Sequence, residues 1–234
     1  MKTNKFYLCG SWHCHITDGA AHTYDIPASV PGCVHTDLQA AGILGDLFWR
    51  TENDTCQWVE NCDVTYTRTF CVDTVQENTY LTFEGLDVYC QVFLNGNCIG
   101  EADDMFRPWS YPVDGSLKTG ENTLEVHFHS PIREVDGLPQ RGGAFTTERL
   151  YTRRIQCTYG WDWVARFVTM GIWKPKPLIG LSTSISTPKR SMPMRHRLPS
   201  VRHFPISPVR NTPILSFLIP TEPRFTPVRE SFCR

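Results

Sequence analysis

The sequence predicts an all-β fold, a single β-sandwich over residues 1–180 whose strands begin at about residue 8. Short segments rich in β-branched and aromatic residues alternate at period two from about residue 64 onward. Turn residues separate these segments, and no amphipathic helical pattern of about 12 residues lies between them. Closely spaced strands without intervening helices are typical of a sandwich of antiparallel sheets.

The individual elements follow from this alternation. The expected strands are 65–72, 79–83, 88–94 and 123–129. Asn95-Gly96-Asn97 follows one strand and apolar residues resume at Cys98, which is the strongest short signal for a hairpin. A second turn is expected at 118–122, and one short helix over 35–41 ends at Gly42. The predicted core consists of apolar strand members: Phe70, Leu81, Phe83, Val92, Leu94, Leu124, Val126 and Phe128.

Charge and hydropathy argue against two classes of partner. The net charge is −1, and the arginines mix with acidic residues instead of forming a basic stripe. We therefore expect no nucleic-acid partner. No run approaches the roughly 18 apolar residues of a membrane span, so we expect no membrane partner. The first residues lack the apolar stretch of a signal peptide, which predicts a cytoplasmic location.

The segment 181–234 differs in character from the rest of the chain. It holds 9 Lys+Arg and 2 Asp+Glu, a balance of +7, whereas residues 1–180 hold 14 and 22, a balance of −8. It contains nine prolines and no Gly, Ala, Asp, Tyr, Trp or Gln. Frequent proline breaks helices and sheets, so we expect a disordered tail. The joint loss of common residue types indicates a foreign reading frame or a misassembled gene end, with a basic regulatory tail as the alternative.

The cysteines and histidines do not predict a metal site. The ten cysteines occur singly, without CxxC spacing, and we expect reduced thiols. Cys9, His13, Cys14 and His15 could be drawn as zinc ligands, but their spacing fits no standard finger and no second ligand pair follows. His127 and His129 lie two apart on one strand face and are expected to be ordinary surface residues. No metal and no cofactor are expected.

Trp161-Asp162-Trp163 is the most informative short segment. Aromatic rings bury apolar area and suit the C–H face of a sugar, and a carboxylate between them can accept from vicinal hydroxyls. These three residues are the candidate substrate-binding residues. The alternative is a strand end that buries two tryptophans and leaves the aspartate in water.

Nine short motifs occur in the order seen in β-mannosidases, and the chain resembles the N-terminal sugar-binding domain of glycoside hydrolase family 2, β-mannosidase branch, over about residues 8–180. The motifs are Val30-Pro31-Gly32-Cys33-Val34-His35-Thr36-Asp37-Leu38, Gly42-Ile43, Trp58, Tyr66, Phe83-Glu84-Gly85-Leu86-Asp87, Leu94-Asn95-Gly96, Gly120-Glu121-Asn122, Gly160-Trp161-Asp162-Trp163 and Gly171-Ile172-Trp173-Lys174.

The resemblance implies a jelly-roll β-sandwich, galactose-binding-like, that precedes an immunoglobulin-like domain and a catalytic (β/α)8 barrel. It also implies that Trp161, Asp162 and Trp163 line the subsite for a terminal mannose at the mouth of that barrel. The family usually continues with Gly-Pro, whereas this chain has Val164-Ala165. β-Mannosides or oligosaccharides are the implied substrates of the joined enzyme.

The resemblance assigns no catalytic residue to this chain. A retaining glycosidase uses two carboxylic acids about 5–5.5 Å apart, and the family supplies both from the barrel. A barrel needs roughly 250 residues, and only 54 follow residue 180, so we expect no turnover by this chain alone. Two alternatives to the fragment of a retaining exo-β-mannosidase stay open: a free-standing carbohydrate-binding module, and a domain that only docks onto a partner carrying the barrel. The β-galactosidase and β-glucuronidase branches are also open, although Trp-Asp-Trp favours mannose.

Overall fold

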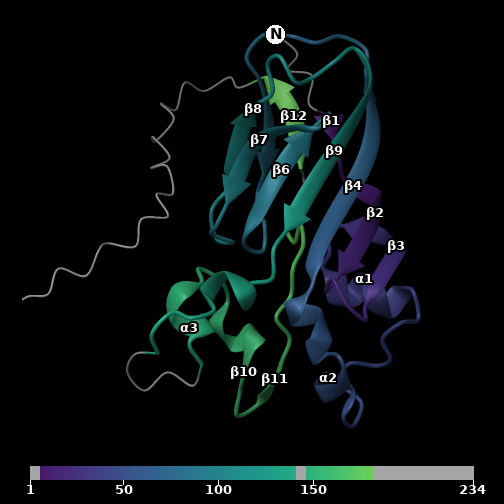
Figure 1. The fold of residues 1–234 in the computed structure, drawn as a ribbon. Coiled ribbons are helices and arrows are strands. Elements are labelled where there is room, and N and C mark those ends of the chain that lie inside the picture. The colour runs from purple at the N-terminus through teal and green to yellow at the C-terminus, as the bar shows by residue number, and fades with distance from the viewer. Residues whose placement is uncertain (1–5, 141–145, 176, 182–234) are drawn as a thin grey trace, which may run out of the picture. The chain divides into compact units, whose positions relative to one another are not determined.

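The computed structural model describes residues 6–140, 146–175 and 177–181, and these form an all-β jelly-roll sandwich (Figure 1). Both main sheets are antiparallel: a six-stranded sheet of order β3-β2-β4-β9-β6-β7 and a four-stranded sheet of order β1-β12-β5-β8. A third, two-stranded sheet contains β10 and β11. The strands are β1 (Phe6–Tyr7), β2 (Gly10–Thr17), β3 (Thr23–Val30), β4 (Asp63–Val72), β5 (Thr79–Phe83), β6 (Cys90–Leu94), β7 (Asn97–Ala102), β8 (Trp109–Pro112), β9 (Gly120–Phe128), β10 (Tyr159–Trp161), β11 (Val164–Arg166) and β12 (Leu178–Leu181).

Short helices complete the chain. They are α1 (Val34–Ala40), α2 (Glu52–Thr55), η1 (Gln57–Asn61), η2 (Arg133–Val135), α3 (Glu148–Tyr151) and η3 (Gln156–Thr158). No helix within the described ranges is long and apolar enough to cross a membrane. In Figure 1, α2, α3, β10 and β11 gather at one end of the sandwich, away from β1 and β12.

The core lies between the two main sheets and follows from period-two alternation along the strands. β9 alternates buried and half-buried side chains, and its partner β4 is in register with it from Val64 opposite Phe128 to Val72 opposite Gly120. All eight residues predicted for the core are buried: Phe70, Leu81, Phe83, Val92, Leu94, Leu124, Val126 and Phe128. The predicted sandwich core is therefore confirmed.

The Asn95-Gly96 hairpin is confirmed and its loop has two residues. Asn95 has φ 52° and Gly96 φ 80°, the left-handed pair that a type I′ turn requires. The Asn95 side chain also joins neighbouring loops: its Nδ2 donates to the Ser116 carbonyl at 2.7 Å, and its Oδ1 accepts from the Thr123 amide at 3.0 Å. The turn is thus fixed by its own backbone conformation and by hydrogen bonds from the Asn95 side chain to two neighbouring segments.

The predicted helix and three of the predicted strands are confirmed with shifted bounds. The predicted helix over 35–41 is α1, which begins one residue earlier at Val34. The strand expected at 123–129 begins at Gly120, inside the predicted turn. The tail over 181–234 begins in the structure with Leu181 as the last residue of β12, and the predicted disorder of 182–234 lies outside the described residues.

The sequence interpretation missed two long strands, β2 and β3, and the shorter strands β1, β8, β10, β11 and β12. β2 and β3 pair from Gly10 opposite Val30 to Thr17 opposite Thr23 and form one edge of the six-stranded sheet. Pro27 lies within β3, and a proline argues against a central strand because it cannot donate a ladder hydrogen bond. Proline is tolerated in an edge strand such as β3, where one side of the strand needs no ladder hydrogen bonds.

Candidate functional site

The Trp-Asp-Trp segment forms the tip of a hairpin, here called the aromatic hairpin (residues 159–166). Tyr159 pairs with Arg166 and Trp161 pairs with Val164, so Asp162 and Trp163 are a two-residue loop. The Val164-Ala165 pair that departs from the family pattern continues as β11. Gly160 has φ +85°, a backbone conformation that favours glycine.

Both tryptophans of the aromatic hairpin reach solvent. Trp161 is 42% exposed and Trp163 is 78% exposed. Their ring centroids lie 6.1 Å apart at an interplanar angle of 67°, so the rings meet edge to face. Asp162, between them, is exposed. The alternative interpretation, in which a strand end buries both tryptophans, is wrong for these side chains.

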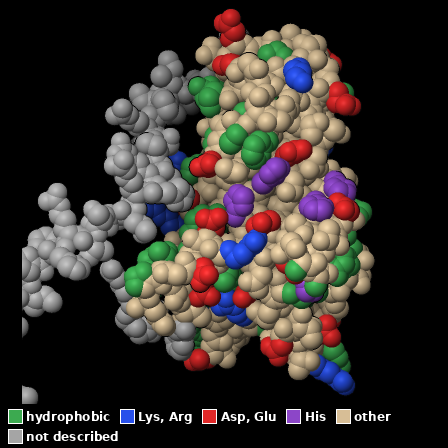
Figure 2. All heavy atoms as spheres, in the orientation of Figure 1, with side chains coloured by type: hydrophobic (Ala, Val, Ile, Leu, Met, Phe, Trp, Pro, Cys, Tyr) green, Lys and Arg blue, Asp and Glu red, His purple; other side chains and the backbone are tan. Residues whose placement is uncertain are grey.

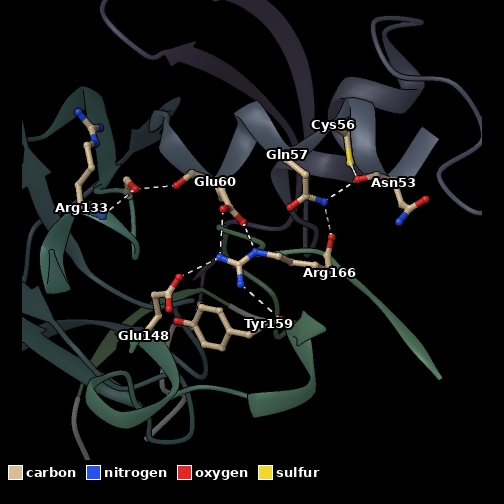
Figure 3. A network of polar contacts seen from close by, with 9 residues as sticks. Asn53, Cys56, Gln57, Glu60, Arg133, Glu148, Tyr159 and Arg166 are labelled. Atoms are coloured by element: carbon tan, nitrogen blue, oxygen red, sulfur yellow. Dashed lines mark hydrogen bonds and ion pairs between the residues drawn. The ribbon is translucent and has the colours of Figure 1, made fainter. Parts of the chain in front are cut away.

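Arg166 ties the base of the aromatic hairpin to two helices (Figure 3). Its Nε donates to Glu60 Oε2 at 2.7 Å and its Nη2 donates to Glu60 Oε1 at 3.0 Å, the two-pronged geometry that a guanidinium makes with one carboxylate. Nη2 also donates to Glu148 Oε1 at 3.1 Å, and Nη1 donates to the Tyr159 carbonyl at 3.4 Å. We call Glu60, Glu148, Tyr159 and Arg166 the Arg166 cluster.

The electrostatics of the Arg166 cluster keep its charges in place. Burial by itself raises the pKa of Glu148, but hydrogen bonds and the nearby Arg166 charge bring that pKa below its ordinary value. For Arg166, burial lowers the pKa, and Glu60 and Glu148 raise it by more, so the net shift is upward. Glu148 and Arg166 therefore stay ionised at neutral pH.

Helix α3 supports the aromatic hairpin at two heights. Glu148 contacts Arg166 at the base of the hairpin, and the next residue, Arg149, places its guanidinium carbon 4.9 Å from the ring centroid of Trp161 near the tip. Thr152, which ends α3, shares a 2.6 Å hydrogen bond with the Tyr159 hydroxyl. The helix and its C-cap residue Thr152 thus contact the hairpin at its base and near its tip.

A buried ion pair lies beneath the aromatic hairpin. Arg154 Nη2 donates to Asp87 Oδ2 at 3.0 Å and to Thr169 Oγ1 at 2.9 Å, and the Arg154 side chain has no solvent exposure. The guanidinium carbon also lies 5.3 Å from the Tyr159 ring centroid.

Burial, with a smaller contribution from the Arg154 charge, lowers the pKa of His35 to about 4. His35 is therefore neutral at pH 7.

A second exposed aromatic pair extends this end of the domain. Phe48 is 84% exposed and Trp49 is 59% exposed. Phe48 meets Phe167 edge to face with 5.5 Å between ring centroids, and Phe167 directly follows the aromatic hairpin. Neither residue was singled out from the sequence, because apolar residues in a loop give no period that predicts exposure. Exposed aromatic patches mark interaction surfaces more often than chance.

The four residues considered as zinc ligands cannot converge. Cys14 points into the core of the sandwich and its pKa is raised by burial, whereas His13 and His15 lie on the outer face of β2. His15 Nδ1 lies 2.9 Å from Asp25 Oδ1 instead. No group of three or more His, Cys, Asp or Glu among the described residues is arranged to hold a metal ion.

The outer face of the six-stranded sheet carries histidines beside acidic side chains (Figure 2). His127 Nε2 lies 3.1 Å from Glu125 Oε2, and His129 Nδ1 lies 3.9 Å from Asp63 Oδ1. These two histidines are surface residues, in agreement with the expectation from their spacing.

Comparisons with known proteins agree with this architecture. The family described as glycosyl hydrolase 2 galactose-binding domain-like matches residues 12–174. The β-mannosidase of Bos taurus is 32% identical over 183 residues, covering 71% of this chain and 20% of the relative. β-Mannosidase B of Emericella nidulans is 35% identical over 168 residues, covering 68% and 20%.

A solved structure agrees as well. The crystal structure of the β-D-mannosidase from Dictyoglomus thermophilum is 35% identical, with a TM-score of 0.66, and the match covers 76% of this chain and 22% of that one. The chain spans about a fifth of the length of the curated relatives it matches. It belongs to the glycosyl hydrolase 2 galactose-binding-domain-like family, and its described fold is the N-terminal domain of β-mannosidase-like enzymes.

Proposed function

We propose that this domain, comprising residues 1–180, supplies part of the sugar subsite of a retaining exo-β-mannosidase-like glycoside hydrolase, with Trp161, Asp162 and Trp163 as the contacting residues. The observation that carries the proposal is the hairpin tip, where two exposed tryptophans meet edge to face beside an exposed carboxylate. Two rings at an angle form a corner that suits the apolar face of a pyranose, and Asp162 can accept hydrogen bonds from its hydroxyls.

The carboxylates of the Arg166 cluster do not fit a catalytic pair. A retaining glycosidase needs one carboxylic acid that holds a proton near neutral pH and a second that is free to attack. Glu60 and Glu148 both accept from Arg166, and the pKa of Glu148 is lowered instead of raised. We therefore assign no catalytic residue here and place the glutamate pair in a (β/α)8 barrel joined to this domain in the working enzyme.

The experiment joins this domain to the remainder of the Dictyoglomus thermophilum β-D-mannosidase and measures hydrolysis of an aryl β-mannoside. A charge-assisted hydrogen bond contributes roughly 1.5–3 kcal/mol, so Asp162→Ala should lower kcat/KM about ten- to hundred-fold. Asp73→Ala, an exposed aspartate beyond the end of β4, is the matched control and should leave kcat/KM unchanged. Full activity of Asp162→Ala, or unfolding of the domain by that change, would assign Asp162 a structural role.

The isolated chain separates the proposal from a free-standing binding module. If the subsite is shared with a barrel, the chain alone should bind mannose only at millimolar concentration or weaker and should not hydrolyse aryl β-mannosides. Micromolar binding of mannose or an oligosaccharide, lost in Trp163→Ala, would instead favour the binding module.

One observation favours a docking role beside the sugar role. Phe48 and Trp49 expose large apolar area, and Phe48 contacts Phe167, which directly follows the aromatic hairpin. With the domain and the barrel produced as separate chains, Phe48→Ser should weaken retention of the domain by the barrel, while the sugar contacts of Asp162 stay in place.

A further inference from the structure

We propose that Arg166 is the positioning residue that sets the orientation of the Trp161 and Trp163 rings, an inference that rests on the proposed sugar-contacting role of the aromatic hairpin. Arg166 itself faces no sugar in this proposal. It acts through the hairpin base, and its effect on any ligand passes through the two rings.

The first step is the number of segments that one guanidinium joins. Arg166 bonds Glu60 of η1, which lies 106 residues away in sequence, and Glu148 of α3, which lies 18 residues away. It also donates to the carbonyl of Tyr159 across the hairpin. Four of the five N–H groups of the side chain are therefore used. Because the guanidinium is planar and rigid, only one orientation of the Arg166 side chain can form all of these hydrogen bonds at once.

The second step is that the partners are themselves fixed. The Glu60 carbonyl accepts from Ser130 Oγ at 2.6 Å, which holds η1 at this point (Figure 3). Gln57 Nε2 donates to the Arg166 carbonyl at 2.9 Å and to the Asn53 carbonyl at 2.5 Å. In a 3₁₀-helix, residues three apart face the same side, so Gln57 and Glu60 together hold the backbone and the side chain of Arg166.

The third step connects the base to the tip. Arg166 is opposite Tyr159, and two residues further along each strand Trp161 is opposite Val164, with only Asp162 and Trp163 between the strands. A two-residue loop transmits the position of its strands directly, because it has few alternative backbone geometries. Trp163 is 78% exposed, so packing at the tip contributes little to its orientation. The Trp161 ring also packs against Arg149 of α3, and α3 is tied to the base through Glu148, so the positions of the two rings depend on the base.

The test uses the full chain and a spectroscopic signal of the two rings. Tryptophans with centroids 6.1 Å apart couple, and this coupling contributes to near-ultraviolet circular dichroism. The chain has seven tryptophans, so the contribution of the pair is isolated as the difference between each protein and the same protein carrying Trp161→Phe and Trp163→Phe. The variants are Arg166→Met and Arg166→Lys, and the matched control is Arg133→Met, an arginine paired with Asp63 on the surface.

The expected result is a loss of the pair signal in folded Arg166→Met, with no change from the same substitution in the double-Phe background. Arg166→Lys should lose the signal as well, because an ammonium cannot form the fork, and Arg133→Met should retain it. An unchanged signal in folded Arg166→Met, equal changes in both backgrounds, or full retention by Arg166→Lys would each overturn the proposal.

A milder variant keeps the test decisive if Arg166→Met does not fold. Glu148→Gln leaves the Glu60 fork intact and removes only the carboxylate charge that α3 presents to Arg166. Glu148→Gln should reduce the pair signal. If Arg166→Met does not fold, an unchanged signal in Glu148→Gln overturns the proposal. Because no sugar enters the measurement, failure of the sugar role in the Asp162→Ala experiment is distinguishable from failure of the positioning role.

Discussion

The sandwich core and the aromatic hairpin end are held by different kinds of interaction. Between the sheets, residues such as Phe83 and Leu94 are fully buried and stabilise the fold through apolar burial. At the hairpin end, large aromatic rings are exposed, and order comes from charge-assisted hydrogen bonds centred on Arg166 and Arg154. The difference shows that the aromatic side chains at the hairpin end are available to contact a ligand or another domain, because polar hydrogen bonds already hold the backbone of the hairpin in place.

The largest expected effect lies in the core. Phe83→Ala should lower the free energy of unfolding by about 3–5 kcal/mol, because it removes buried area and leaves a cavity. The same truncation at the exposed end, Trp163→Ala, should change it by less than about 0.5 kcal/mol. Urea denaturation monitored by far-ultraviolet circular dichroism measures both. Equal losses in the two variants would contradict the contrast between the regions.

An intermediate effect is expected at the border of the two regions, where His35 meets Phe167 edge to face. The pKa of His35 is about 4 in the folded chain and about 6.5 when unfolded, so between these values only the unfolded chain binds the proton. Stability from neutral His35 is thus complete above pH 6.5 and is lost as the pH falls toward 4. Lowering the pH from 7 to 4 should cost about 3 kcal/mol through this residue.

The contribution of His35 is isolated by a matched variant. Denaturation curves at a series of pH values are compared for the wild type and His35→Leu, since other groups titrate equally in both. The difference between the two proteins should vary with pH only below about 6.5. A difference that stays constant down to pH 4 would show that His35 is protonated freely in the folded domain.

A small effect is expected where a single cation–π contact is removed at the hairpin tip. Arg149→Met removes the cation–π contact with Trp161 and should cost about 0.5–1 kcal/mol by urea denaturation. Arg107→Met is the matched variant on the sandwich, where the guanidinium carbon of Arg107 lies 4.0 Å from the Trp109 ring centroid. Because Trp109 is buried, the cost there should be the larger of the two. The reverse order would mean that the tip contact is the better desolvated one.

The strands that sequence alone predicts are those with clean period-two alternation. β5 matches its predicted range, and the Asn95-Gly96 turn matches because its left-handed geometry selects those residue types. β2 also alternates, with Trp12, Cys14 and Ile16 inward, but its outward residues include two histidines and the strand escaped the interpretation. β3 was obscured by Pro27, which only the edge position explains.

The candidate site is predictable only in part. The resemblance selects Trp161, Asp162 and Trp163, whereas their exposure depends on how the hairpin is supported. That support joins Glu60 to Arg166 across 106 residues, and no periodic or short-range pattern pairs a glutamate with an arginine at that separation. Gln57 and Glu60 stand three residues apart on one side of η1, and both reach Arg166 only because the fold brings the hairpin against that side.

The pairing of β1 with β12 has a consequence for engineering. Phe6 lies opposite Ile179 and Tyr7 opposite Leu178, so the first and last described strands are neighbours in the four-stranded sheet. A short peptide bridge could therefore close the domain into a ring, and new ends could be opened in a surface turn such as the one at Gly115. A permuted domain of this kind would carry the aromatic hairpin unchanged, because the Arg166 cluster and α3, which support the hairpin, lie outside β1 and β12.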